Sequence, residues 1–181
     1  MCHICPSWLS FILYNPIRKA FTNREKILSE SGIGDDSVVL EVGAGNGFLT
    51  ETVAAHAKKV YAVELQEGMA TKLRKRIDHF GDKVVVVHGD IASCDMGDGV
   101  VDACLMYYSF HEVRDKLSSA KNISKSIKPG GILSIYEPTI EVRAVDMQET
   151  TAMFERFGLR KEKEREGSFT RFVRLRKHGG R

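Results

Sequence analysis

Three glycines stand at alternate positions in the stretch "VLEVGAGNGFLT", residues 39–50, directly after a short apolar run. Glu41 precedes Gly43, Gly45 and Gly47. Glycine lowers the stability of a helix or strand interior, so the group indicates a sharp turn or a backbone that a ligand approaches closely. A glycine loop is a weak signal by itself, because turns also need glycine. The loop is therefore a candidate binding site that other residues must support.

The spacing of the glycines disfavours a nicotinamide or flavin dinucleotide. The dinucleotide fingerprint is G-x-G-x-x-G. This chain has G-x-G-x-G, and Phe48 stands where a third dinucleotide glycine would be. An NAD-dependent oxidoreductase is thus a disfavoured alternative.

Carboxylates also end the next two apolar stretches. Glu64 closes "VYAVE" and Asp90 closes "KVVVVHGD". An ionised carboxylate at Glu64 can accept both hydroxyl hydrogens of a ribose, and Asp90 can accept from an exocyclic amine such as adenine N6. The structural alternative for Glu64 is an ordinary exposed acid at a helix start. With Glu41 and the glycine loop, these acids predict a nucleoside site that has an amino-acid tail and no pyrophosphate.

Alternating apolar and amphipathic stretches predict the scaffold that positions these residues. We expect strands over residues 38–42, 59–65, 83–90, 100–108 and 132–138. We expect helices over residues 23–31, 48–56, 66–80 and 117–127, and a last one that starts near residue 146. The unbroken β-branched run at 83–90 predicts a strand that is buried on both faces. The alternation predicts an α/β fold with a Rossmann-like, doubly wound, mostly parallel sheet.

The C-terminal part predicts one more helix and a hairpin. Asp146 and Glu149 have the spacing of a capping box at a helix start. "LRKEKER" and "FTRFVRLRK" flank a turn at residues 166–168, which predicts an antiparallel C-terminal hairpin at one edge of the sheet. We interpret the basic stretch 170–181 as a solvated strand edge in preference to a phosphate-binding patch.

Composition predicts one globular domain over residues 1–181, with a cofactor-binding core over 37–176. The chain is 43% hydrophobic and 28% charged, and its net charge of +3 is too small to indicate nucleic acid by itself. Four cysteines in a chain of this length fit reduced thiols in a cytoplasmic protein. They are Cys2, Cys5, Cys94 and Cys104.

The first 22 residues predict a strap or lid on the domain. Their apolar run, residues 8–14, is far shorter than the ~20 residues that a membrane span needs, and it lacks the flanks of a signal peptide. We therefore expect no membrane span. Cys2 and Cys5 form a C-x-x-C pair, but there is no second such pair, so we predict no metal site.

At this level the chain resembles the class I S-adenosyl-L-methionine (SAM)-dependent methyltransferases. The resemblance is carried by "EVGAGNG", "VYAVEL", "HGDIA", "VVDACLMYYSFHEV" and "KPGGILSIYEP", and it covers roughly residues 37–175. It implies the class I methyltransferase fold, SAM as cofactor and S-adenosyl-L-homocysteine (SAH) as product.

The resemblance also implies which residues contact the cofactor. Gly43, Gly45 and Gly47 would face its methionine part, and Glu41 would bind near its amino group. Glu64 would hold the ribose. The remaining contacts implied are Leu65 and Met69 beside the adenosine, Asp90 and Ile91 around the adenine, and Tyr107 near the sulfonium methyl.

A narrower likeness is to small, ubiquinone/menaquinone-methyltransferase-like proteins from anaerobic microbes. It rests on the N-terminal pattern "CP…W…NP.R" at residues 5–18, on "FHEV" and on "EP". Many of those proteins have a histidine-valine pair after "EP", where this chain reads "TIEV", so a role of that histidine does not transfer.

The acceptor is expected on the wall formed by "YYSFHE", residues 107–112, after the fourth strand. His111 is the candidate general base near neutral pH. Glu112 and Glu137 could orient His111 or bind a cationic acceptor, and Tyr107 and Tyr108 could form an aromatic wall. For Glu112, an ordinary acid at a helix start is an equal alternative. In-line alignment of the acceptor is expected to outweigh acid–base help.

We therefore predict a methyltransferase that acts on a small-molecule acceptor. The alternatives are an RNA, other nucleic-acid or protein methyltransferase, and a non-catalytic cofactor-binding module. Nucleic acid is disfavoured because amino-methylating enzymes of that kind carry an N/D-P-P-Y/F/W motif where this chain has "YYSF". The intact cofactor motifs disfavour a non-catalytic module. The sequence leaves open the acceptor and the oligomeric state.

Overall fold

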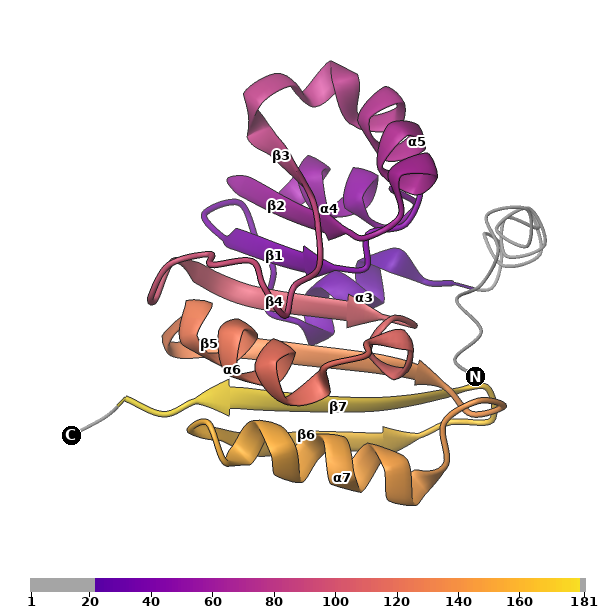
Figure 1. Ribbon diagram of the computed structural model, residues 1–181, viewed down its shortest axis with the longest axis vertical. Coiled ribbons are helices and arrows are strands. Elements are labelled where there is room, and N and C mark those ends of the chain that lie inside the picture. The colour runs from indigo at the N-terminus through magenta and orange to yellow at the C-terminus, as the bar shows by residue number, and fades with distance from the viewer. Residues whose placement is uncertain (1–21, 180–181) are drawn as a thin grey trace.

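The computed structural model describes residues 22–179, which form a sheet with helices on both faces (Figure 1). The helices are α3 (Arg24–Glu30), α4 (Thr50–His56), α5 (Glu67–Ile77), α6 (Lys116–Ser126) and α7 (Ala144–Glu155). The strands are β1 (Val38–Val42), β2 (Lys59–Glu64), β3 (Val84–His88), β4 (Val101–Tyr107), β5 (Ile127–Pro138), β6 (Leu159–Glu166) and β7 (Thr170–Lys177). The expected strap or lid lies outside the described residues, apart from Thr22.

The strand order confirms the predicted doubly wound sheet with a C-terminal hairpin. The order is β3-β2-β1-β4-β5-β7-β6. The strands β1 to β5 pair in parallel, and β7 is antiparallel to both β5 and β6. The chain leaves β1 toward β2 on one side and later returns to β4 on the other. In such sheets ligands bind beyond the carboxyl ends of the strands at this switch point.

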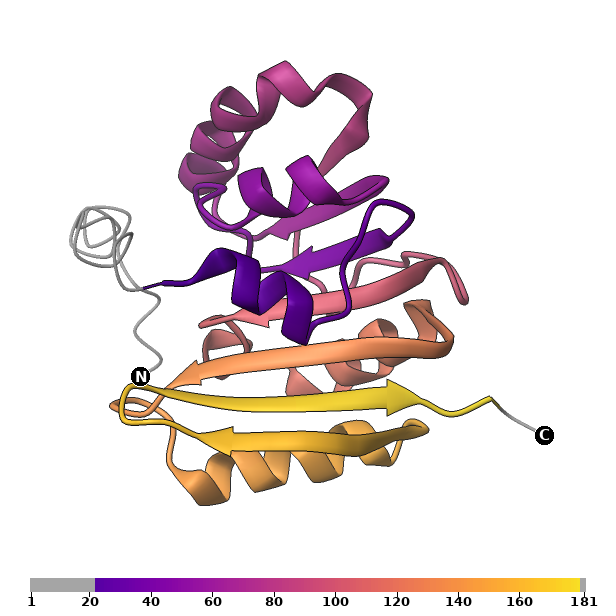
Figure 2. The same cartoon turned by 180° about the vertical axis from the view of Figure 1, so that it is seen from behind.

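Two apolar clusters fix the helices to the two faces of the sheet. Side chains alternate along β4, so that Cys104 and Met106 pack into the cluster of α6 and α7, whereas Ala103 and Leu105 pack into the cluster of α3, α4 and α5. Figure 1 shows α6 and α7 in front of the sheet, and Figure 2 shows α3 and α4 on the opposite face. The central strands are therefore buried on both faces, as parallel strands are.

One exception corrects the prediction for residues 83–90. β3 is the edge strand, with 36% of Val85 exposed and His88 also exposed. A β-branched run reports how well the residues suit a strand, but it does not report the place of that strand in the sheet.

The basic C-terminal strand is also placed differently from the prediction. β7 lies between β5 and β6, and its Phe172 and Val173 are fully buried. Its arginines pair with acids of the neighbouring strand, Arg171 with Glu166 at 2.5 Å, for example. The predicted hairpin is confirmed. The solvated edge of the sheet, however, is β6, the first strand of the hairpin, and not the basic strand β7.

The last helix begins earlier than predicted. α7 starts at Ala144, and its capping box joins Arg143 to Asp146, whose carboxylate accepts the Arg143 amide at 2.8 Å. Asp146 thus takes the third helical position that was expected for Glu149. None of the helices within residues 22–179 is long and apolar enough to cross a membrane.

Candidate active site

The glycine loop leaves β1 with a backbone that other residues rarely adopt. Gly43, Gly45 and Gly47 have φ values of 73°, 58° and 83°. The Gly43 amide donates to the Val63 carbonyl at 2.9 Å, which ties the loop to β2. A Cβ atom at Gly43 would lie 2.4 Å from the Cβ of Ser109. The loop thus needs glycine both for its turns and for close packing against the residues after β4.

The three glycines have different surroundings. A Cβ at Gly45 would meet no atom within 4 Å, so this part of the loop faces open space. A Cβ at Gly47 would lie 2.8 Å from a methyl carbon of Leu73, so Gly47 packs against α5. Gly43 and Gly45 line the cavity described below, whereas Gly47 is not among its lining residues.

Glu64 lies across the loop from Gly45. The two oxygens of its buried carboxylate accept one backbone amide each, from Gly45 and from Gln66, both at 2.8 Å. A carboxylate oxygen has two lone pairs, so each can accept a further hydrogen bond. The two features predicted at the ends of β1 and β2, the glycine loop and Glu64, are therefore in direct contact.

Glu41 is a buried acid whose side chain is not fully paired. It is 3% exposed, and its Oε2 atom has no hydrogen-bond partner among residues 22–179. Burial raises the pKa of Glu41 to about 8, and the charge of Glu64 acts in the same direction. Buried polar groups normally have partners, so an exception next to a cavity indicates a place for a ligand.

A cavity of about 410 Å³ lies over the glycine loop and the ends of β2 and β4. Its volume is in the range typical of small-molecule and cofactor sites. It gathers every residue that was predicted to bind the cofactor except Gly47. Those residues are Glu41, Gly43, Gly45, Glu64, Leu65, Met69, Asp90, Ile91 and Tyr107. Of the four predicted catalytic residues, Tyr107 and Glu112 line the cavity, and His111 and Glu137 do not.

Two tyrosine rings form one wall of the cavity. The rings of Tyr107 and Tyr108 are stacked, with centroids 4.3 Å apart and planes 17° apart. Tyr108 has a φ of 57°, a costly conformation for a bulky residue. Its amide donates to the Tyr136 carbonyl at 2.8 Å, and its hydroxyl makes a short hydrogen bond with Thr170.

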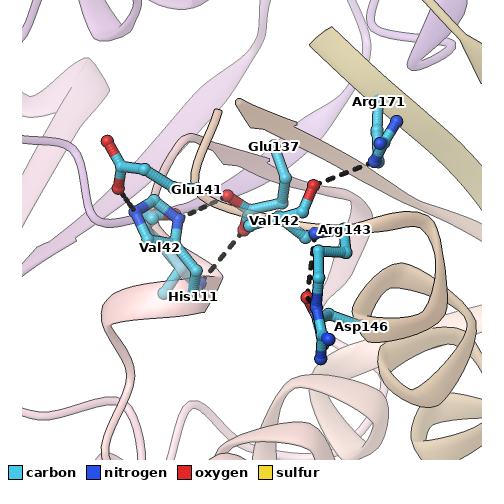
Figure 3. A network of polar contacts seen from close by, with 9 residues as sticks. Val42, His111, Glu137, Glu141, Val142, Arg143, Asp146 and Arg171 are labelled. Atoms are coloured by element: carbon cyan, nitrogen blue, oxygen red, sulfur yellow. Dashed lines mark hydrogen bonds and ion pairs between the residues drawn. The ribbon is translucent and has the colours of Figure 1, made fainter. Parts of the chain in front are cut away.

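In the short turn after β4, residues 110–112, His111 is held between two carboxylates (Figure 3). Its Nδ1 lies 2.5 Å from Oε2 of Glu137, and its Nε2 lies 2.9 Å from Oε2 of Glu141. The His111 amide also donates to the other oxygen of Glu137, at 3.1 Å. Glu137 is 2% exposed. These contacts fix the short turn that carries Glu112.

Comparison with known proteins agrees with this geometry. A family model described as a methyltransferase domain matches residues 40–135, more than half of the chain. The chain belongs to this methyltransferase family. The matched segment runs from the middle of β1 to the last third of β5, and it contains the glycine loop, Glu64, Asp90 and the two tyrosines.

Curated methyltransferases match parts of the chain. One of Geobacillus sp. (strain WCH70) is 36% identical over 99 residues, which is 55% of this chain and 45% of that protein. Ribosomal RNA small subunit methyltransferase A of Staphylococcus carnosus is 38% identical over 76 residues, 42% of this chain and 25% of that protein. The matched segments span half or less of these relatives.

A solved structure matches nearly the whole of this chain. The SAM-dependent methyltransferase from Aquifex aeolicus has a TM-score of 0.82 and 25% identity, and the match covers 94% of this chain and 97% of that one. This likeness confirms the class I methyltransferase fold. The narrower likeness to ubiquinone and menaquinone methyltransferases stays a prediction.

The cavity fits the SAM cofactor of this family. The unpaired Oε2 atom of Glu41 can receive an ammonium group, and the free lone pairs of Glu64 can receive a diol. The open space beside Gly45 leaves room for a ligand against the loop. Asp90 lines the same cavity, and one of its oxygens accepts the Ala92 amide at 2.9 Å.

Both ring nitrogens of His111, the predicted general base, lie within 2.9 Å of carboxylate oxygens. Burial lowers the pKa of His111, but the hydrogen bond and charge of Glu137, with the charge of Glu141, more than offset this, and the net shift is upward. An imidazolium that donates from both nitrogens has no lone pair for a substrate proton. Glu141, which completes the clamp, was missed because a lone surface-loop glutamate has no sequence signal.

Metal ligation finds no support in the part of the chain that the structure covers. Within residues 22–179, no three His, Cys, Asp or Glu side chains are grouped so that they could hold an ion. Cys94 and Cys104 are free thiols. The Cys2–Cys5 pair lies outside this range.

Proposed function

We propose that this protein transfers the methyl group of SAM to a small-molecule acceptor. The observation that carries the proposal is the buried Glu41 carboxyl, whose Oε2 has no hydrogen-bond partner among residues 22–179, beside the cavity at the switch point of a methyltransferase-family sheet. A cationic group of the cofactor would restore the missing interaction at this carboxyl.

The cofactor would lie along the ends of β1, β2 and β3. Glu41 and the amides around Gly43 and Gly45 would hold its amino-acid end. Glu64 would accept the ribose hydroxyls with the lone pairs that the Gly45 and Gln66 amides leave free. The other contacts proposed are Leu65 and Met69 beside the adenosine and Asp90 and Ile91 around the adenine.

Once bound, SAM supplies a methyl group activated by its positive sulfur. The chain's own task is to orient the acceptor and to exclude water, for which positioning alone can contribute ~7–11 kcal/mol. Tyr107 and Tyr108 would form the wall against which the acceptor lies. His111 and Glu137 would act behind that wall, because they hold the turn that bears Glu112.

A macromolecular acceptor is the second candidate. The relatives include a ribosomal RNA methyltransferase and, at 36% identity over 117 residues, a rice protein named for protein arginine N-methylation. The small-molecule acceptor is preferred because the stacked tyrosines and Glu112 line the same cavity as the cofactor residues.

Labelled methyl transfer tests the proposal. Purified protein is incubated with methyl-labelled SAM and separate small-molecule, RNA and protein fractions of a cell extract. We expect label in the small-molecule fraction, reduced by about a hundredfold in Glu64→Gln, because hydrogen bonds to a charged group contribute about 1.5–3 kcal/mol. Exposed Glu149→Gln is the matched control and should behave as wild type.

Two results would contradict the proposal. Label that enters only RNA or protein would reject the small-molecule acceptor and retain methyl transfer. No label in any fraction, together with no binding of SAH, would reject the methyltransferase activity.

A further inference from the structure

We infer that the methyl acceptor is an amine, and that the Glu112 carboxylate takes the proton that this amine loses. The inference rests on the proposed methyl transfer, and it names the chemical class of the acceptor. It follows from three features of the cavity wall beyond β4, which contains Tyr107, Tyr108 and Glu112. These features are its aromatic face, its excess of carboxylates, and a carboxylate that can accept a proton.

The aromatic face suits a cation. Tyr107 and Tyr108 present a stacked pair to the cavity, and the face of an aromatic ring attracts an ammonium group. The left-handed backbone of Tyr108 is strained for a bulky residue, so its place in the wall is maintained against that strain. The bonds of Tyr108 to Tyr136 and Thr170 provide that restraint.

The charge of the wall is negative. One histidine, His111, lies between two carboxylates, Glu137 and Glu141, and Glu112 adds a third carboxylate whose pKa their charges affect. Glu64 contributes from β2. The cation nearest in sequence, Arg114, is exposed at the cavity lining.

Two further arginines, Arg24 and Arg76, line the cavity, and Arg24 is already engaged. Arg24 donates to the Phe48 carbonyl at 3.2 Å, lies over the Phe48 ring, and is 3.8 Å from the Glu51 carboxylate. A thiol, phenol or carboxylic acid must approach as an anion or become one, and the carboxylates of the wall oppose this. An amine approaches as a cation and reacts as a neutral molecule, so the same field favours its binding.

Glu112 is the group in this wall that is available to receive a proton. The hydroxyl of Tyr107 lies 3.3 Å from Thr22, the hydroxyl of Tyr108 bonds to Thr170, and both nitrogens of His111 are occupied. The Glu112 carboxyl lines the cavity and makes no side-chain hydrogen bond to another of residues 22–179. Glu112 is exposed as a whole residue, but partial burial of its carboxyl, and then the charges of Glu141, Glu64 and Glu137, raise its pKa against the effect of His111. A carboxylate with a raised pKa is a better base near neutral pH.

The step balances as follows. The bound ammonium gives one proton to the Glu112 carboxylate and becomes a neutral amine. The nitrogen lone pair forms a bond to the methyl carbon while the bond from that carbon to sulfur breaks. The electron pair of the broken bond stays on sulfur, which becomes the neutral thioether of SAH, and the product is an N-methylammonium ion.

Carbon-13 spectroscopy of the product decides the class of acceptor. The full chain is first shown to bind SAH by calorimetry, and is then incubated with ¹³C-methyl SAM and the small-molecule fraction of a cell extract. The chemical shift of the transferred carbon distinguishes N-methyl from O-, S- and C-methyl groups. A new N-methyl signal supports the inference.

An O-, S- or C-methyl product would overturn the amine assignment and leave the methyltransferase function intact. Absence of any labelled product from a protein that binds SAH would also count against it. Absence of SAH binding would reject the proposed function and this inference with it.

Substitution of Glu112 tests the proton acceptor separately. We expect Glu112→Gln to lower kcat/KM for the labelled amine by about 10²–10³-fold and to remove the acidic limb of its pH profile, with the Kd for SAH within about twofold of wild type. Glu112→Asp should restore part of the rate. The exposed Glu149→Gln should retain both rate and pH profile. A Glu112→Gln variant with an unchanged profile would overturn the assignment.

Discussion

The carboxyl edge of the sheet has two halves, a first half beyond β1 and β2 and a second half beyond β4 and β5. They differ in whether their polar groups are paired within the protein. Beyond β1 and β2, backbone amides and carboxylates surround a cavity, and Glu41 lacks a full set of partners among residues 22–179. Beyond β4 and β5, the polar side chains bind one another, as in the clamp of His111 by Glu137 and Glu141 (Figure 3).

This difference separates two tasks. The first half keeps unsatisfied groups that a ligand can complete, which is a stability cost borne for binding. In the second half the polar side chains other than Glu112 are paired with one another, and they fix the position of a wall. We therefore expect substitutions in the first half to change cofactor binding, and those in the second half to change turnover with little change in cofactor binding.

The largest effect is expected at Glu41, as a dependence of stability on pH. The native carboxyl has a pKa of about 8, above its ordinary value of 4.5, so between these pH values the folded chain holds a proton that the unfolded chain has lost. The free energy of unfolding therefore falls as pH rises through this window, by at most about 5 kcal/mol. In Glu41→Gln, the free energy of unfolding should no longer decrease over this pH range.

Urea titrations of the cofactor-free protein near pH 5 and near pH 8.5 measure this effect. We expect the variant to exceed wild type in stability at the higher pH and to match it more closely at the lower one. Glu149→Gln should follow wild type at both. Identical pH dependence in wild type and Glu41→Gln would mean that Glu41 is not the unsatisfied group of this half.

The second effect is expected at Gly43. An alanine there would combine a φ of 73° with a Cβ atom 2.4 Å from Ser109, so Gly43→Ala should cost about 3 kcal/mol and weaken SAH binding. Gly34→Ala is the matched control, because no atom lies within 4 Å of its added Cβ. Thermal unfolding and calorimetry with SAH measure both quantities. Equal behaviour of the two variants would refute a structural requirement for glycine in the loop.

These first two sites are also the ones that the sequence predicts best. The glycine loop and the strand-end acids Glu41 and Glu64 depend on local features, namely an apolar run, a turn and the residue beside it. Parallel strands then bring their carboxyl ends to one edge without further information. That is why nearly all of the predicted cofactor residues line one cavity.

The second half depends on pairings between distant segments, which a single sequence does not reveal. His111 finds Glu137 and Glu141, and Tyr108 finds Thr170, only when β5 and the β6–β7 hairpin are in place. For the same reason, the residue types of the two strands did not predict that β3 lies at an edge of the sheet and that β7 lies inside it.

A smaller effect is expected at His111. Its pKa is raised, so its contribution to stability is complete below about pH 6.5 and is lost as pH rises through the higher pKa of the folded state. His111→Gln should cost about 2 kcal/mol near pH 6, because it leaves the buried Glu137 without its charged partner, and it should slow turnover with little change in SAH affinity. Exposed His178→Gln is the control. A His111→Gln protein as stable and as active as wild type would break the contrast between the halves.

Calorimetry of SAH binding near pH 7, in two buffers that differ in ionisation enthalpy, tests the central claim most directly. If the cofactor's ammonium group completes Glu41, the carboxyl must ionise on binding. Since most of the Glu41 side chains are protonated at that pH, close to one proton should be released for each SAH bound, and Glu41→Gln should release almost none. No heat with SAH in either buffer, alongside a clear signal with a nicotinamide dinucleotide, would contradict the claim.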